Sequence, residues 1–416
     1  MKKQAILNWS VRLLVLALAT GLALGGPLPV WAGRIFPALS PLVALAHGVA
    51  ARSWYAPLFW LGPPVLMLAL AIWRGRWFCR WLCPTGTLVA GVTACGLRKT
   101  VWPFRLNGVL FWAALAGGVV GLPLATGLDP LAQFSRLTVN ITAWRDGIAW
   151  IPGLILPAVL LLGIFQPMLW CTKLCPLGYL LERAQLLTRS KTARATLNQT
   201  RRDLLIGAAI GLPLALLARR GLGKWLGAAA GRPAAALPVL PPGADSPTRF
   251  AALCTRCYAC VHVCPTQVLR PGRPQAGTPM AVWFTPVLDT DAATCDEYCN
   301  RCTQACPAGA IRPLTQAVKH QTQIGVAEVI RSACLAWADD QHCMVCQEFC
   351  PYRAIGIDHD AKGLPRPVVR TERCRGCGAC QNQCPAVRAG KAILVRGVPV
   401  QRQLAPVPGA PRTGTD

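Results

Sequence analysis

Residues 254–265 read Cys254-Thr255-Arg256-Cys257-Tyr258-Ala259-Cys260-Val261-His262-Val263-Cys264-Pro265. Three further copies of this Cys-x2-Cys-x2-Cys-x3-Cys-Pro array start at residues 295, 334 and 374. A near-constant period indicates a repeated structural unit. The second array carries one extra residue and the third an insertion, and both extra segments are predicted to form surface loops. The sixteen array cysteines are Cys254, Cys257, Cys260, Cys264, Cys295, Cys299, Cys302, Cys306, Cys334, Cys343, Cys346, Cys350, Cys374, Cys377, Cys380 and Cys384.

Each array offers four thiolates at a spacing that suits a cubane iron–sulfur cluster. Three cysteines spaced by two residues can wrap one face of the cluster, and the fourth, followed by proline, leaves the loop. In two-cluster ferredoxins that fourth cysteine ligates the neighbouring cluster. The sequence therefore predicts four [4Fe–4S] clusters as electron-transfer cofactors. It does not predict which arrays pair.

Two other roles for the arrays are less favoured. Structural zinc sites usually show two Cys-x2-Cys pairs separated by a longer gap, not a three-plus-one array ending in Cys-Pro. Disulfides between such close cysteines would close only short loops. The apolar residues after each Cys-Pro predict short strands at 268–269, 310–311, 354–357 and 392–395. Two such strands with two cysteine loops would form each of two ferredoxin-like halves of an α+β domain.

The residues before the arrays are apolar and basic. The chain is 53% hydrophobic and 14% charged, with a net charge of +26. Lys and Arg lie in short segments between apolar runs, which favours positive-inside membrane topology and argues against a nucleic-acid partner. Five apolar runs predict membrane spans, at about 9–28, 57–73, 107–127, 148–170 and 204–218. The expected fold is a membrane domain of four helices with a fifth anchoring span, followed by the polyferredoxin domain.

This topology predicts where each part lies. The basic loops 74–105 and 171–203 are expected on the cytoplasmic side of a bacterial inner membrane, and the polyferredoxin domain on the periplasmic side. A twin-arginine export signal directs the export of proteins that are already folded, and a similar motif is found at Thr200-Arg201-Arg202-Asp203-Leu204-Leu205. The positive-inside rule alone would also explain its arginines. The predicted units are the membrane domain 1–200, the signal and fifth span 201–220, a linker 221–248, the cluster domain 249–400 and a disordered tail 401–416.

Four further cysteines form two matched pairs, Cys79-x3-Cys83-Pro84 and Cys171-x3-Cys175-Pro176. A four-residue spacing puts both sulfurs of a pair on one helical face, and the proline ends that helix. The four thiolates could hold a fifth iron–sulfur cluster, act as two redox-active dithiols, or bind another thiophilic metal. The remaining cysteine, Cys95, is expected to be an apolar filler.

Other cofactors find no signature in the sequence. Only five histidines occur, and just His47 lies among the predicted spans, which excludes a bis-His haem there. His342 precedes Cys343 and is expected to be a bystander, because its array already has four cysteines. No flavin-binding signature is found.

The motifs resemble two families of redox proteins. The first 200 residues, with their paired Cys-x3-Cys-Pro motifs, are similar to NapH and MauN, and residues 200 onward are similar to the ferredoxin-type proteins NapG and MauM. The chain thus looks like a fusion of the two. The resemblance implies a quinol dehydrogenase component, which takes electrons from the membrane quinone pool and delivers them to a periplasmic cytochrome c, reductase or dehydrogenase. The lipid bilayer would be a further partner.

Two other functions remain open on the residues alone. Electrons could flow in the reverse direction, from a periplasmic dehydrogenase into quinone. The chain could instead be a reductase or maturation factor for a metalloenzyme, using the two Cys-x3-Cys pairs. No catalytic residue and no quinone-binding residue can be assigned from the sequence.

Overall fold

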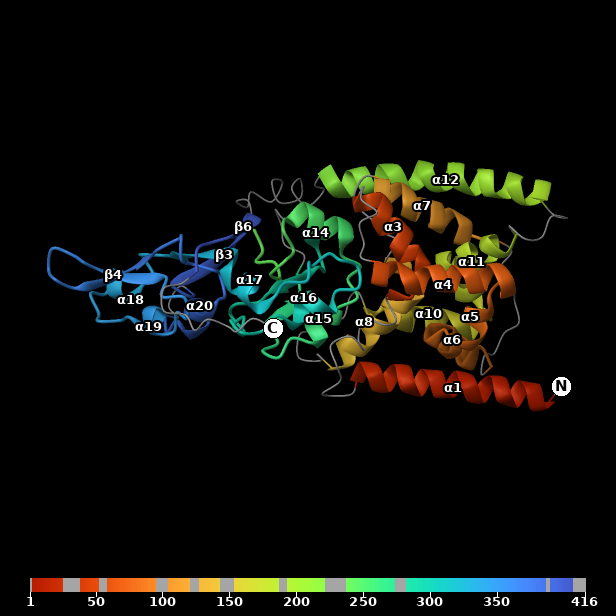
Figure 1. The fold of residues 1–416 in the computed structure, drawn as a ribbon, viewed down its shortest axis with the longest axis horizontal. Coiled ribbons are helices and arrows are strands. Elements are labelled where there is room, and N and C mark those ends of the chain that lie inside the picture. The colour runs from red at the N-terminus through yellow and green to blue at the C-terminus, as the bar shows by residue number, and fades with distance from the viewer. Residues whose placement is uncertain are drawn as a thin grey trace.

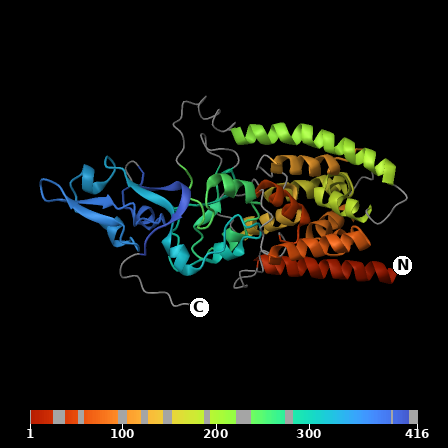
Figure 2. The ribbon, with the colours of Figure 1, turned by 45° about the horizontal axis from the view of Figure 1, so that its top comes forward.

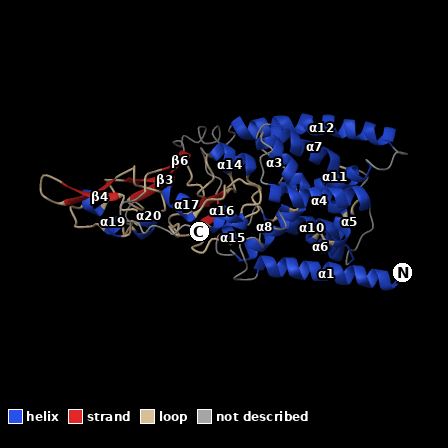
Figure 3. Ribbon diagram, in the orientation of Figure 1, coloured by secondary structure: helices blue, strands red, loops and turns tan. Residues whose placement is uncertain are grey.

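The computed structural model describes residues 2–24, 38–51, 58–94, 104–119, 127–142, 153–186, 193–220, 237–273, 282–386 and 390–406. The described residues form two parts, which follow one another along the long axis of the molecule (Figure 1). Residues 2–220 form a helical domain, and residues 237–406 form a cysteine-array domain that contains the strands (Figure 3). The predicted tail beyond residue 406 and the predicted linker from 221 to 236 fall outside the described residues.

The helical domain is a bundle whose long helices α1 and α12 lie on opposite sides (Figure 2). Its core is formed by apolar side chains such as Leu42, Phe111, Leu131 and Leu156, which are all at most 5% exposed. The described helices are α1 (Lys2–Leu24), α3 (Pro41–Ala51), α4 (Leu58–Arg74), α5 (Trp77–Trp81), α6 (Pro84–Ala94), α7 (Asn107–Val119), α8 (Pro130–Thr142), α10 (Ile155–Phe165), the π-helix η3 (Trp170–Leu174), α11 (Pro176–Leu186) and α12 (Ala193–Arg220).

The helices contradict the predicted membrane domain. None of those described has both the length and the apolar character that spanning a bilayer requires. Helices α4, α7 and α10 contain 17, 13 and 11 residues, whereas about 20 are needed. The longer helix α12 carries Arg201, Arg202 and Asp203. The four spans and the fifth anchoring span are therefore wrong for the described helices, and the inner-membrane location and the two sides derived from them are withdrawn.

The cysteine-array domain consists of short elements around three two-stranded antiparallel sheets, β1–β2, β4–β5 and β3–β6. Strand β6 returns from the C-terminal end to pair with β3, with Gly325 opposite Gly397. The elements are α14 (Pro247–Leu253), α15 (Ala259–His262), β1 (Leu269–Pro271), β2 (Pro286–Leu288), α16 (Arg301–Ala305), α17 (Gln316–Gln321), β3 (Thr322–Val329), α18 (Leu335–Ala338), α19 (Val345–Glu348), β4 (Ile355–His359), β5 (Pro365–Val369), α20 (Ala379–Gln383) and β6 (Ile393–Gln403).

Three of the four strands expected after the Cys-Pro pairs are present. Leu269 begins β1, Ile355 begins β4 and Ile393 begins β6. Ala310 and Ile311 are buried but belong to no strand. The apolar runs therefore located core residues correctly, and one of them packs as a loop. Residues 237–240, the described end of the predicted linker, also pack into the domain, where the Leu237 carbonyl accepts from Gly397 N–H.

Candidate metal centres

The array cysteines line three cavities, and each cavity combines three cysteines of one array with the fourth cysteine of another. Site II consists of Cys295, Cys299, Cys302 and Cys264. Site III consists of Cys374, Cys377, Cys380 and Cys350. Site IV consists of Cys334, Cys343, Cys346 and Cys384. The two middle arrays keep this arrangement despite their altered spacing.

A fourth group, site I, brings Cys254, Cys257 and Cys260 close to Cys306. Burial raises the pKa of Cys254 to about 12, and the neighbouring thiols of Cys257 and Cys306 add to the rise. Burial likewise raises the pKa of Cys260 well above its usual value, followed by the effects of Cys254, Cys257 and Cys306. Arrays one and two therefore exchange their fourth cysteines, and so do arrays three and four. This exchange is the pairing that spacing alone left undecided.

A short helix positions the third cysteine of each array. Cys260, Cys302, Cys346 and Cys380 lie in α15, α16, α19 and α20. Two of these helices follow a residue with positive φ, Tyr258 before α15 and Gly378 before α20. A left-handed residue at this point turns the chain sharply, so that the second and third cysteines approach from different directions.

Backbone N–H groups point at several of the sulfurs. Ala354 donates to Cys350 Sγ at 3.3 Å and Ala327 to Cys374 Sγ at 3.4 Å. Arg256 donates to Cys254 Sγ at 3.4 Å. Such bonds stabilise the thiolate over the thiol and, with burial, tune a thiolate-ligated centre.

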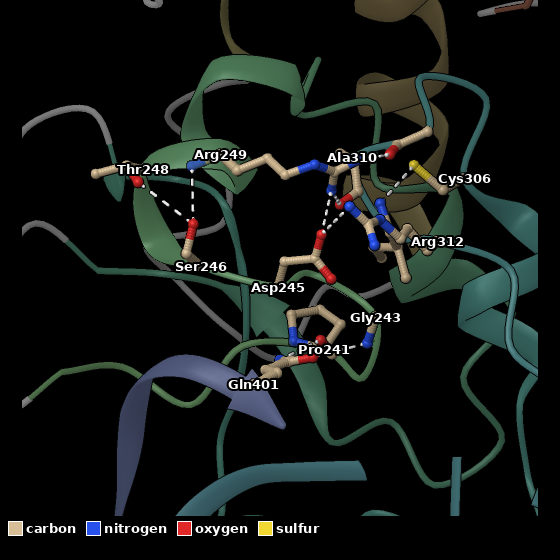
Figure 4. Close-up of polar contacts among 12 residues, drawn as sticks. Pro241, Gly243, Asp245, Ser246, Thr248, Arg249, Cys306, Ala310, Arg312 and Gln401 are labelled. Carbon is tan, nitrogen blue, oxygen red and sulfur yellow. Dashed lines mark hydrogen bonds and ion pairs between the residues drawn. The ribbon is translucent and has the colours of Figure 1, made fainter. Parts of the chain in front are cut away.

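Figure 4 shows how the segment before the first array supports site I. Asp245 pairs with Arg312 at 2.9 Å and with Arg249 at 3.4 Å, and Arg249 in turn donates to the Ala310 carbonyl. These contacts hold the loop after Cys306, from which Ile311 N–H donates to Cys306 Sγ at 3.5 Å. The chain around residue 245 thus fixes the donor that faces the exchanged cysteine.

Direct contacts connect successive sites. Cys295 N–H of site II donates to the Cys377 carbonyl of site III at 2.9 Å. Buried Lys319 donates to the Asp296 carbonyl, and its charge opposes the effect of burial on the pKa of Cys295. Sites I and II share two arrays, as do sites III and IV. The four sites therefore form a continuous series from I to IV.

The helical domain contacts the first array through α8. Arg136 is 2% exposed and donates to the carbonyls of Gly127, Thr255 and Arg256 at 2.6 to 2.8 Å. Ser135 Oγ donates to the Cys257 carbonyl at 2.8 Å. Sequence reasoning missed both residues, because nothing local marks a helix more than a hundred positions upstream as the support of a cysteine loop.

The remaining predicted residues are also placed. Cys79, Cys83, Cys171 and Cys175 come together inside the helical domain, and we call them the inner site. His342 is exposed and does not line the site IV cavity. Cys95 falls outside the described residues.

The cysteines suit a cluster better than a single ion. Throughout the described ranges, no three His, Cys, Asp or Glu side chains converge closely enough to hold one metal ion. A structural zinc ion requires four ligands at about 2.0–2.3 Å from one point. A cubane is larger, and its four thiolates surround a volume. Four sulfurs lining a buried cavity, with N–H groups directed at them, therefore fit an iron–sulfur cluster.

Comparison with known proteins agrees with this reading. The model of the 4Fe–4S dicluster domain family matches residues 253–335 and 341–387, which contain all sixteen array cysteines. The match indicates iron–sulfur clusters in this domain, with an electron-transfer role.

Three similar curated proteins share these features. MauM, a methylamine utilization ferredoxin-type protein of Methylobacillus flagellatus, is 33% identical over 40% of this chain and 72% of its own length. The ferredoxin-type protein NapF of Escherichia coli K12 is 31% identical over 40% of this chain and 89% of its own. The ferredoxin-type protein NapG of the same strain is 26% identical over 38% of this chain and 72% of its own.

These matches support the resemblance to MauM and NapG, and they do not support the one to NapH and MauN. No solved structure matches this chain. MauM and NapF are each more than 30% identical to this chain, which covers over two thirds of their length. The chain therefore belongs to the family of ferredoxin-type 4Fe–4S proteins.

Proposed function

We propose that the sixteen array cysteines hold four [4Fe–4S] clusters in a row, and that the chain uses them to move electrons from a quinol to a redox partner protein. Clusters of this type, when bound, supply one-electron redox chemistry. The observation that carries the proposal is the continuous series of sites I to IV. Exchanged cysteines link I with II and III with IV, and the Cys295–Cys377 hydrogen bond links II with III.

The protein's own groups have three tasks in this function. The cysteines bind the clusters, and the burial of Cys254, Cys260, Cys302 and Cys380 excludes water from them. Backbone N–H groups stabilise thiolate charge. Lys319 places a positive charge beside site II, close to Cys295 and Cys302. Such differences in charge and burial set the potential of each centre separately.

The quinol donor is the part of the proposal that relies on resemblance alone, now that to NapG and MauM, and the partner is proposed because the electrons need an acceptor. A cytochrome c, a reductase or a dehydrogenase would serve as redox partner. The name of MauM connects that protein with methylamine utilization. For this chain, we propose a partner enzyme with its own one-electron centre. Electron flow from that partner into quinone would show that the proposed direction of transfer is wrong.

Metal analysis with spectroscopy tests the proposal. Protein purified without oxygen should contain about four irons and four acid-labile sulfides per array site. The Cys260→Ser variant should lose the iron of site I, whereas Cys95→Ser should lose none. Electron paramagnetic resonance measures reduction of the clusters, first by dithionite and then, in a separate sample, by a water-soluble quinol analogue. Zinc in place of iron would overturn the cluster assignment. Clusters that dithionite reduces and the quinol does not would overturn the donor.

A further inference from the structure

The inner site has an approximate two-fold repeat in its local structure. Cys79 lies in the short helix α5, and Cys83 directly precedes α6, which begins at Pro84. Cys171 lies in the short helix η3, and Cys175 directly precedes α11, which begins at Pro176. The prolines therefore start the next helix in both copies, a position that requires no N–H donor. Two segments far apart in sequence present two thiols each in the same way.

Each copy also aims a backbone N–H group at its second cysteine. Gly86 donates to Cys83 Sγ and Gly178 donates to Cys175 Sγ, both at 3.3 Å. A Cβ atom at Gly86 would lie 3.0 Å from the Cys79 carbonyl oxygen, and one at Gly178 would lie 3.3 Å from that of Cys171. These bonds are as short as the N–H bond to Cys350 Sγ in site III. The inner thiols are thus supported like the array thiols.

The four thiols interact across the pairs as well as within them. Cys83 and Cys175 are buried in one apolar cluster, and the half-buried Cys79 and Cys171 pack against that cluster. Four thiols gathered in this way repel one another when they are ionised, and they gain nothing from their closeness unless a cation lies between them.

Positive side chains surround this group. Arg76 donates to the Cys171 carbonyl at 3.0 Å and pairs with Glu182. Arg12 donates to the Gly86 carbonyl at 3.4 Å, and its Nε is buried without a hydrogen-bond partner in the described structure. A cluster held by four thiolates carries net negative charge, which the guanidinium group of Arg12 would partly offset, since the charge of Arg76 is matched by Glu182. Two inert thiol pairs would need no such charges.

We propose that Cys79, Cys83, Cys171 and Cys175 hold one further iron–sulfur cluster inside the helical domain. Redox-active dithiols would require closeness only within each pair, whereas the cysteines of both pairs gather in one cluster of the bundle core. A single thiophilic ion would require three sulfurs to converge on one point, and no such group is found among the described residues. The proposal uses none of the array cysteines, so it goes beyond the proposed function and can fail or succeed independently.

Helix α8 places this centre next to the array series. Thr85, two residues after Cys83, donates through Oγ1 to the Pro130 carbonyl at 2.7 Å, at the start of α8. Five residues later on α8, Ser135 donates through Oγ to the Cys257 carbonyl of site I. A short path of covalent and hydrogen bonds therefore joins a cysteine of the inner site to a cysteine of site I.

Iron stoichiometry tests the site directly. The full chain, purified without oxygen, should contain about twenty irons, and the variant with all four inner cysteines changed to serine about sixteen, since each cubane holds four. Native mass spectrometry of the unaltered protein should show five cluster increments, a readout that requires no variant to fold. The Cys95→Ser variant is the matched control.

The outcomes separate the two proposals. Four cluster increments in the mass spectrum, or an iron content that does not change when all four inner cysteines are replaced by serine, would overturn the inner cluster and leave the array clusters in place. One mole of zinc lost with the inner cysteines would replace the cluster by a zinc ion. Iron retained only by the inner site would overturn the proposed function instead. The Gly86→Ala variant adds a spectroscopic test. Its Cβ atom would lie 3.0 Å from the Cys79 carbonyl oxygen, and the resulting shift of the Gly86 N–H away from Cys83 Sγ should change a single paramagnetic signal, one that is absent when all four inner cysteines are replaced by serine.

Discussion

The two domains build their cysteine groups in different ways. In the cysteine-array domain, three thiols of each group come from one short loop and helix, and only the fourth comes from a partner array. In the helical domain, the inner site combines two helix ends that meet only when α5, α6, η3 and α11 have packed. Local spacing therefore specifies most of an array site, whereas tertiary packing specifies the inner site. Loss of packing should damage the two kinds of site differently.

The largest effect is expected for Gly376→Ala. Gly376 has φ of +80°, and a Cβ atom would lie 2.5 Å from Gly325 Cα in β3. Strain and the clash together should destabilise the cysteine-array domain by roughly 4 kcal/mol. Gly363→Ala is the matched control, because Gly363 has φ of +74° and no atom within 4 Å of its Cβ, so only about 1 kcal/mol of strain is expected. Equal unfolding midpoints for the two variants, measured by circular dichroism, would refute the clash.

The second-largest effect is expected at the contact between α8 of the helical domain and the first cysteine array. Arg136→Met removes the donor to three carbonyls, those of Gly127, Thr255 and Arg256. The loss should be on the order of 3 kcal/mol. Calorimetry should then show two unfolding transitions where the unaltered chain shows coupled ones, because α8 no longer holds the first array. A single transition shifted as a whole would mean that α8 supports only its own domain. Thr138→Ala, on the same helix, is the control that leaves these three bonds intact.

The helical domain can be loosened by itself with Gly211→Ala. In α12, a Cβ atom at Gly211 would lie 2.6 Å from Ala113 Cα in α7. Separating the two helices should destabilise the domain by about 2 kcal/mol. Gly91→Ala, where nothing lies within 4 Å, should be neutral or slightly stabilising. If local spacing specifies the array sites, the iron of sites I to IV should survive in Gly211→Ala. Iron loss from the arrays in this variant would break the comparison between the domains.

The sequence predicted the parts of the site that are local and missed those that depend on packing. The array spacing singled out the sixteen cysteines that the structure brings into four groups, and the apolar residues after the Cys-Pro pairs predicted the strands that begin at Leu269, Ile355 and Ile393. It did not identify the exchange of Cys306 and Cys264, because partner arrays are chosen by packing. Arg136, Ser135 and Lys319 carry no local signal either. Each acts through contacts with residues that are distant along the chain.

The apolar runs were misread for a physical reason. Hydrophobic composition reports that a segment avoids water, but not how long its helix is. The run at 148–170 contains α10, which ends at Phe165, followed by a short turn and the separate π-helix η3. Gln166 is extended and ends the helix. A run of membrane-spanning length thus contains two short helices, which bury Leu156 and Trp170 in the bundle core.

The smallest expected effect, and the one that depends on pH, concerns Asp129 at the start of α8. Its carboxylate accepts from Ser40 Oγ at 2.6 Å and from the N–H groups of Leu131 and Ala132. Burial raises the pKa of Asp129 despite these bonds and the charge of Arg136. The folded chain therefore holds this proton more tightly than the unfolded chain, so stability falls as pH rises from the unfolded pKa through the folded one.

Asp129→Asn keeps the N-terminal cap of α8 and removes the burial of a charge. It should unfold no earlier than the unaltered chain at pH 8, and any advantage should disappear below about pH 4, where both chains are uncharged at this position. Asp129→Ala removes the cap as well as the charge and should be about 1 kcal/mol less stable than Asp129→Asn at every pH, because neither variant titrates at this position. Thermal unfolding at pH 4 and pH 8 measures both variants. If Asp129→Asn is less stable than the unaltered chain at pH 8, the attraction between the Asp129 carboxylate and Arg136 exceeds the cost of burying the charge. The contact between the domains is then electrostatic.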